Sequence, residues 1–271
     1  MDSARYLDSL ATDFSLLRAA ATAPGPETLT VPVPTCPGWT MADLVRHVGE
    51  VYLHKTLAIR LGDFPGEQDW PAEVEALPPL ALLDRTYAGL SQELTTRAPD
   101  SPAPSWYKPE QTVAFWMRRM AQETLIHRLD AELARQAAAG AAQAPTGGAV
   151  SPIPDDLAAD GVAEVLIRFL GYGSTAWPDE FAALAGPRLE TASGDDTVVV
   201  ETDGATWTVR PRPGHVDVRT GTSGEVHAVV GGDPVALLRW LWGRGGEEEV
   251  SVSGDPAWVD YLRRLLVAAT Q

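Results

Sequence analysis

Two of the four helical patterns in the first half of this sequence carry ionisable side chains where an apolar stripe is expected. The helices predicted at 3–21 and 79–98 have uninterrupted apolar stripes at steps of three and four residues, as core-facing helices require. The helix that begins near Thr40 and the helix predicted at 112–138 have the same period, but histidine and carboxylate side chains interrupt it. Because burying an unpaired carboxylate is costly, the pattern predicts a four-helix bundle whose core compensates these charges.

The interruptions are spaced so that helical turns bring them onto common faces. They are His47 and His54 on the second helix, and Glu123, His127 and Asp130 on the fourth. Glu123 and His127 are four residues apart, so they lie one above the other on one helix face. Imidazole and carboxylate groups are good ligands for a borderline metal such as Zn²⁺. With His47 as the natural third ligand from a facing helix, the pattern indicates a metal site of the kind that helical bundles build in their cores.

The same residues also admit plain structural interpretations. A single histidine such as His47 on a helix stripe is usually a satisfied core or boundary residue, and Glu123 with His127 can form a solvated i,i+4 pair. Asp130 can pair with Arg128 or with an arginine of another helix. The metal interpretation gains because all of these positions fall on predicted core seams of one bundle.

Charge and cysteine usage exclude several classes of function. Lysine and arginine number 21 and aspartate and glutamate 37, which gives a formal net charge of −16 and makes nucleic acid an unsuitable partner. There is neither a signal-peptide pattern nor an apolar run of membrane-spanning length, so a cytoplasmic protein without a membrane partner is expected. The one cysteine, Cys36, rules out an internal disulfide and a cysteine-rich metal cluster. It precedes a helix N-terminus, but Pro37 and Gly38 indicate a turn there and a structural role.

The sequence changes character after the fourth helix. An Ala-, Gly- and Pro-rich segment at 137–156 predicts a linker or mobile loop, and a further helix at 156–171 is assigned to the first domain, 1–175. From Thr197 the apolar period becomes two, which predicts several short strands separated by turns. Two helices are expected after these strands, with a strand between them; the three elements are predicted at 234–242, 249–253 and 255–269. The second domain, 190–271, is therefore predicted to be a small α+β domain with helices on one face of a sheet.

Four stretches of the chain resemble the mycothiol-dependent maleylpyruvate isomerase family. In the first half these are VPVPTCPGWTMADLVRHVGEVYLHK and RRMAQETLIHRLDAE; in the second half they are DGATWTVRPRPGHVDV and the run from VVGGDPVALLRWLWGR to VSVSGDPAWVDYLRRLL. The resemblance implies an α+β protein with an N-terminal DinB-like four-helix bundle and a small sterol-carrier-like sheet domain. It also implies that His47, Glu123 and His127 hold the family's metal, and that the thiol cosubstrate is mycothiol, the small-molecule thiol of actinobacteria.

A site with three protein ligands leaves a fourth metal position open, which is typical of catalytic rather than structural zinc. A thiol bound there is deprotonated, and the resulting thiolate can attack an electrophile. If it adds reversibly to an activated cis double bond, the outcome is cis–trans isomerisation; if the product leaves as an S-conjugate, the outcome is S-transfer. Because nothing in the sequence is specific to maleylpyruvate, S-transfer to a small-molecule electrophile is slightly favoured. The sequence does not predict the oligomeric state.

Other functions are compatible with the same residues, and further residues are candidates for supporting roles. The same two histidines and carboxylate also suit a non-haem Fe(II) enzyme, or a non-catalytic, metal-stabilised binding module in which His54 is the fourth ligand. Asp130 is a candidate for orienting His127 by a hydrogen bond, and His54 for a proton shuttle or pocket lining. Arg244 is a weak candidate for an anion contact. His215 and His227 are assigned no metal.

Overall fold

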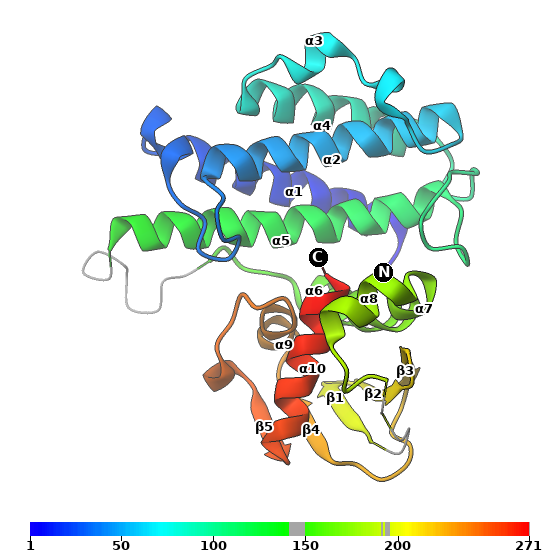
Figure 1. Ribbon diagram of the computed structural model, residues 1–271. Helices are drawn as coiled ribbons and strands as arrows, with labels where there is room; N and C mark the ends of the chain where they lie inside the picture. The colour runs from blue at the N-terminus through cyan, green and yellow to red at the C-terminus, as the bar shows by residue number, and fades with distance from the viewer. Residues whose placement is uncertain (141–149, 191, 193–195, 271) are drawn as a thin grey trace. The chain divides into compact units, whose positions relative to one another are not determined.

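The chain divides into two units, Met1–Pro152 and Ile153–Gln271. The computed structural model describes residues 1–140, 150–190, 192 and 196–270 of it (Figure 1). Within these residues, no helix combines the length and the apolar character that crossing a membrane requires. The predicted fold class, a helical bundle followed by a small α+β domain, is confirmed.

The first unit is built around four long helices, and all four were predicted. They are α1 (Ser3–Thr22), α2 (Met41–Leu61), α4 (Pro79–Thr96) and α5 (Val113–Ala139). The connections contain only the short elements η1 (Pro26–Thr30), η2 (Glu67–Asp69) and α3 (Ala72–Glu75). Helix α2 packs against α4 and α5, while α1 packs against α5 (Figure 1).

Local sequence signals set the ends of helix α2. The Thr40 side chain accepts a hydrogen bond from the backbone N–H of Asp43, and the Asp43 carboxylate accepts one from the backbone N–H of Thr40. This capping box satisfies two backbone donors that the first turn of a helix leaves unpaired. At the other end Gly62 adopts φ 72°, a left-handed conformation that glycine reaches without steric cost.

The bundle core follows much of the predicted stripes, but on α2 the buried face is shifted, so that Tyr52 is buried while its neighbour Val51, a predicted stripe residue, is half-buried. Leu44 and Tyr52 of α2 and Trp116 of α5 are fully buried. Leu61 continues the spacing of Leu44, Val51 and Ala58 in the sequence, which predicts a buried side chain, but it is 52% exposed. It is the last residue of the helix, so no neighbouring turn covers it.

The second unit combines a five-stranded sheet with several helices. Its strands are β1 (Val198–Thr202), β2 (Ala205–Arg212), β3 (His215–Thr220), β4 (Ala228–Gly231) and β5 (Ser251–Gly254). Its helices are α6 (Asp155–Ala163), the π-helical η3 (Glu164–Tyr172), α7 (Gly173–Ala176), α8 (Pro178–Ala185), α9 (Pro234–Leu241), the 3₁₀ turn η4 (Glu247–Glu249) and α10 (Pro256–Ala269). The sequence did not predict α8, nor the change from α- to π-helical winding at Glu164.

The sheet has the strand order β3-β2-β1-β4-β5, with β1 and β4 parallel and the other neighbours antiparallel. Three consecutive valines of the central strand β1, Val198 to Val200, are at most 2% exposed, so both faces of this strand are covered. Helix α10 contacts β1, β4 and β5, while η3 and α8 contact β3 (Figure 1). The edge strand β5 is exposed throughout.

The boundary between the units lies earlier in the chain than predicted. The predicted helix at 156–171 was assigned to the first domain, but α6 packs against α9, and η3 packs against β3 and α10, all in the second unit. Its apolar side chains therefore complete the core beside the sheet. The predicted linker 137–156 is also shorter, because α5 continues to Ala139 and α6 begins at Asp155. Residues 141–149 of that segment lie outside the described residues.

Candidate functional site

His47 of α2 meets Glu123 and His127 of α5 inside the bundle. One nitrogen of each histidine and one carboxylate oxygen all lie within 4.8 Å of one another. Oε1 of Glu123 lies 3.6 Å from Nε2 of His47 and 3.2 Å from Nε2 of His127. These three residues, hereafter the candidate triad, are the ones that the sequence selected, and the structure brings them together.

The candidate triad is enclosed on the α5 side and reachable on the α2 side. The side chains of Glu123 and His127 are 15% and 12% exposed, whereas that of His47 is 37% exposed. The ring of Trp39 lies 4.9 Å from the ring of His47, centroid to centroid, and limits where that imidazole can turn. A small molecule can therefore approach the site from the His47 side.

A buried aspartate holds the imidazole of His127. Oδ2 of Asp130 lies 3.0 Å from Nδ1 of His127, and this carboxylate is fully buried. Asp130 also accepts hydrogen bonds from Thr35 Oγ1 at 2.5 Å and from Cys36 Sγ at 3.6 Å. Because Nδ1 faces Asp130, Nε2 is the atom that faces Glu123. The predicted orienting contact of Asp130 is thus present, and Cys36 has a place within it as a hydrogen-bond donor.

A buried arginine that the sequence analysis did not single out contacts the remaining oxygen of Glu123. Arg119 stands one turn before Glu123 on α5, its side chain is 6% exposed, and a guanidinium nitrogen bonds Oε2 of Glu123. This contact leaves Oε1 facing the two histidines. The i,i+4 spacing of Arg119 and Glu123 was the sequence signal that could have revealed the pair.

The charges of the candidate triad are strongly coupled. Burial alone would raise the pKa of Glu123, but His127 and Arg119 outweigh it and hold that pKa well below its usual value. Burial would lower the pKa of His127, but the neighbouring Glu123 and Asp130 carboxylates raise it to about 9. When no metal ion is bound, the imidazole of His127 therefore holds a proton, which the neighbouring carboxylates stabilise. A divalent cation bound by the same donor atoms would replace that proton.

The donor set and its surroundings fit a divalent metal. Two imidazole nitrogens and one carboxylate oxygen converge from two helices, which is a common arrangement for a zinc site with an open position. A metal-binding histidine usually donates its second ring N–H to a carboxylate, and Asp130 occupies that position beside His127. The site thus contains both the donor atoms and the orienting contact that such a metal would need.

The other sequence candidates, His54 and Arg244, are not members of the candidate triad. His54 is not part of the group that converges within the described residues; its ring lies 6.0 Å from Phe64 and 6.4 Å from Trp70, centroid to centroid. Burial and the nearby Lys55 lower the pKa of His54 to about 4, so this imidazole is neutral. The guanidinium of Arg244 donates a hydrogen bond to the carbonyl of Trp242, within the second unit.

The two histidines of the sheet belong to the second unit. His215 is exposed at the start of β3, and its Nδ1 lies 3.4 Å from the Pro213 carbonyl oxygen. His227 is half-buried, and its Nδ1 accepts a hydrogen bond from the backbone of Thr197.

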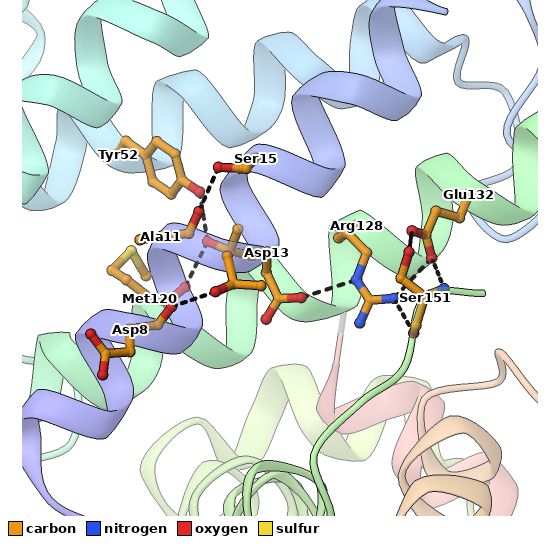
Figure 2. A network of polar contacts seen from close by, with 11 residues as sticks. Asp8, Ala11, Asp13, Ser15, Tyr52, Met120, Arg128, Glu132 and Ser151 are labelled. Carbon is orange, nitrogen blue, oxygen red and sulfur yellow. Dashed lines mark hydrogen bonds and ion pairs between the residues drawn. The ribbon is translucent and has the colours of Figure 1, made fainter.

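A second polar network lies behind the candidate triad on α5 and ties three segments together. The fully buried Arg128 donates from Nε to Asp13 of α1, and from Nη1 to both Glu132 and the carbonyl of Ser151 (Figure 2). Glu132 in turn accepts hydrogen bonds from the backbone and the hydroxyl of Ser151. Arg128 is the residue after His127, so the network fixes the part of α5 that carries this imidazole.

Two solved structures resemble the chain along nearly its whole length. The crystal structure of the mycothiol-dependent maleylpyruvate isomerase superposes with a TM-score of 0.57 at 15% identity, and the match covers 93% of each chain. A crystal structure of a histidine-to-alanine mutant of the mycothiol-dependent maleylpyruvate isomerase gives 0.58 at 14% identity with the same coverage. At such identities the likeness shows a shared fold. The comparison with curated proteins finds no match.

Two family models match the sequence in consecutive regions. The mycothiol maleylpyruvate isomerase N-terminal domain matches residues 10–132, which include the whole candidate triad. The MDMPI C-terminal domain matches residues 156–260, beginning where α6 begins its first turn. Together the two matches span most of the chain, in the order that the sequence resemblance predicted. The chain therefore belongs to the mycothiol-dependent maleylpyruvate isomerase family.

Proposed function

We propose that this protein is a metal-dependent enzyme that uses a low-molecular-weight thiol, mycothiol, to attack a small electrophile. Zn²⁺ is the proposed metal, held by His47, Glu123 and His127. The observation that carries the proposal is the convergence of these three donor groups within 4.8 Å, with Asp130 behind His127. Family membership supports the thiol and the reaction type, a cis–trans isomerisation or the S-transfer that shares its first step.

A divalent ion at the candidate triad would supply one thing, a lowered pKa for a thiol that reaches its open position. The protein supplies the rest. Asp130 keeps the Nδ1 proton of His127, so that Nε2 stays available as a neutral ligand. Arg119 keeps Glu123 ionised and turned toward the histidines. The partly exposed His47 marks the side from which thiol and electrophile enter.

The proposed reaction then depends on the electrophile. The thiolate sulfur adds to one carbon of a cis double bond that a carbonyl activates, and the electron pair of the double bond moves onto the carbonyl oxygen. The former carbon–carbon double bond is now single, and the molecule rotates about it. Return of the electron pair then re-forms the double bond, expels the thiolate and leaves the trans isomer. In an S-transfer, a proton is taken up instead and the S-conjugate leaves as product.

The decisive experiment combines metal analysis with a product assay. The purified, zinc-loaded protein is incubated with mycothiol and maleylpyruvate, and products are separated by chromatography with mass detection. A thiol-dependent yield of the trans isomer supports the isomerase, and a conjugate heavier by the mass of mycothiol supports the transferase. Neither product, with maleylpyruvate or with a panel of other activated alkenes and epoxides, would contradict the proposal.

Elemental analysis of the same preparation tests the two alternatives that share the donor set. Iron in place of zinc, with turnover that needs oxygen, would favour a non-haem Fe(II) enzyme. A tightly held metal without any turnover would favour a binding module. That alternative requires a fourth protein ligand, and within the described residues His54 does not supply one.

A further inference from the structure

The chain contains only two lysines, and one of them lies half-buried at the same helix interface as the candidate triad. Three contacts across this interface show that α2 and α5 run antiparallel: His47 meets His127, Tyr52 meets Thr124, and Lys55 meets Trp116. The first contact belongs to the candidate triad. The last lies about 12 Å further along α2, since eight residues of helix rise by that amount.

Among the residues that the structure describes, Lys55 has no carboxylate partner. Its Nζ lies 5.2 Å from the centre of the Trp116 ring and 3.2 Å from Nδ1 of His54. Within the described part of the chain, no carboxylate oxygen lies within the 4.0 Å of an ion pair with it. An ammonium group has three donors, and His54, which is neutral, accepts from one of them. A half-buried charge kept without a counter-ion lowers stability, so its retention points to a ligand.

Lys55 interacts electrostatically with the candidate triad. Burial lowers the pKa of Lys55 to about 8, the Glu123 carboxylate opposes this shift, and Arg119 adds to it. Lys55 and Arg119 thus provide two positive charges on the same side of the candidate triad, along the α2–α5 interface. A bound divalent ion would neutralise Glu123 and leave these two cations to act on whatever enters. The chain as a whole has a net charge of −16, so this local excess of positive charge is opposite in sign to the overall charge.

The Trp116 ring determines where the ammonium can reach. Trp116 is fully buried, and its indole N–H donates to the carbonyl of Pro104 at 2.9 Å, which fixes the ring. Because the ring face attracts the ammonium, Lys55 is held over α5 rather than extending into solvent. A rigidly placed donor is what orientation of a small anion requires.

We propose that Lys55 binds a carboxylate of the electrophile and thereby orients the reacting carbon toward the candidate triad, so that the enzyme selects anionic substrates. This inference rests on the proposed function, because it assigns one end of the same substrate. The reacting end lies at the candidate triad, and the carboxylate lies toward Lys55, just over two helical turns away along α2. Arg119, which is bonded to Glu123, adds positive charge between the two ends. Lys55 is a positioning residue, since it does not touch the reacting atoms.

The test measures binding of maleate, a small cis dicarboxylate, to the zinc-loaded full-length protein by isothermal titration calorimetry. Lys55→Met keeps an apolar chain of similar length over Trp116 and removes the charge. Loss of a charge-assisted hydrogen bond predicts that maleate binds about 10- to 100-fold more weakly to this variant. Lys55→Arg keeps the charge and should bind maleate nearly as the parent protein does. Lys108→Met, which removes the exposed second lysine, is the matched control and should be unchanged.

The uncharged dimethyl maleate separates anion recognition from general damage, since its binding should be equal in the parent and in Lys55→Met. Equal maleate affinity for the parent and Lys55→Met would overturn the proposal, as would failure of the parent to bind maleate at all. A variant with normal maleate binding but weaker mycothiol binding would also overturn it and would assign Lys55 to the thiol. Metal content and thiol-dependent turnover of the parent are measured separately. A result that contradicts the anion site therefore does not contradict the proposed function, and a result that contradicts the proposed function does not by itself contradict the anion site.

Discussion

Nδ1 of His127 lies 3.0 Å from Oδ2 of the fully buried Asp130, while Nε2 of the same ring faces Glu123. Asp130 is itself held by Thr35 and Cys36 from the loop before α2. The orientation of a proposed metal ligand on α5 is thus set by a chain of contacts that reaches the loop leading into α2, the other helix of the site.

Replacing Asp130 by asparagine should weaken metal binding without abolishing it. The amide has the same shape but no charge, so the bond to Nδ1–H becomes weaker, and outer contacts of this kind typically contribute about 10- to 100-fold in metal affinity. Competition with a chromogenic chelator measures the zinc dissociation constant of Asp130→Asn against the parent. Unchanged affinity would show that the Asp130 contact is structural only.

His47 and His54 form a matched pair on one helix with opposite expectations. His47→Ala removes a member of the candidate triad and should reduce bound zinc from about one per chain to a small fraction, because two protein ligands rarely retain zinc. His54→Ala should keep the metal, since that ring faces Phe64 and Trp70. His215→Ala, in the sheet unit, should also keep it. Elemental analysis of dialysed protein gives the answer, and loss of zinc in His54→Ala would mean that His54 is a ligand.

Periodicity predicted the bundle and selected the residues of the candidate triad because helical faces depend on local spacing. The four long helices have apolar stripes that recur every three or four residues, and Glu123 and His127 share a face through their separation alone. Helix starts also depend on local spacing, which is why the start of α2 could be predicted near Thr40, where Thr40 and Asp43 form a capping box.

Features that depend on contacts between distant segments could not be predicted in this way. Periodicity does not say that Lys55 lies over Trp116, since this depends on how α2 and α5 are paired and staggered. The same holds for the helical stretch 155–176, whose apolar face suited either unit until its contacts with α9 and β3 were known. The exposure of Leu61 could not be predicted for a related reason, because an apolar residue at a helix end is buried only if another segment covers it.

The sterol-carrier likeness of the sheet unit and the anion contact of Arg244 stay predictions. For Arg244, a variant such as Arg244→Met with normal metal content but a raised KM for an anionic substrate would support the contact. An unchanged KM would contradict it.

The Asp13–Arg128–Glu132 network predicts a large stability effect from a single change. Arg128→Met leaves two acidic groups without their cation in a buried setting, and breaking a buried ion pair in this way costs about 3–5 kcal/mol. Chemical denaturation by urea, followed by circular dichroism, measures the free energy of unfolding. Arg18→Met is the control: Arg18 pairs with Asp84 on the surface, with side chains 46% and 40% exposed, and such a pair contributes at most about 1 kcal/mol. Equal effects of the two substitutions would contradict the structural role of the network.

The raised pKa of His127 predicts how the stability of the metal-free protein depends on pH. The folded value of about 9 lies above the unfolded value of 6.5, because Glu123 and Asp130 outweigh the effect of burial. Below pH 6.5 the imidazole is protonated in both states and its contribution is complete; the contribution is lost as pH rises toward 9. The free energy of unfolding should therefore fall by about 1.4 kcal/mol per unit between roughly pH 7 and 8.

Chelator-treated protein, unfolded with urea at several pH values in this window, provides the measurement. The window ends near 8 because Lys55, whose pKa burial lowers to about 8, contributes with the opposite sign above it. His127→Ala removes the titrating group, so its metal-free form should show a much flatter profile. Zinc-loaded protein should also lose the decline, because a bound metal ion takes the place of the imidazole proton. A decline of the same size in His127→Ala would assign the effect to another group and contradict the proposed charge state of the candidate triad.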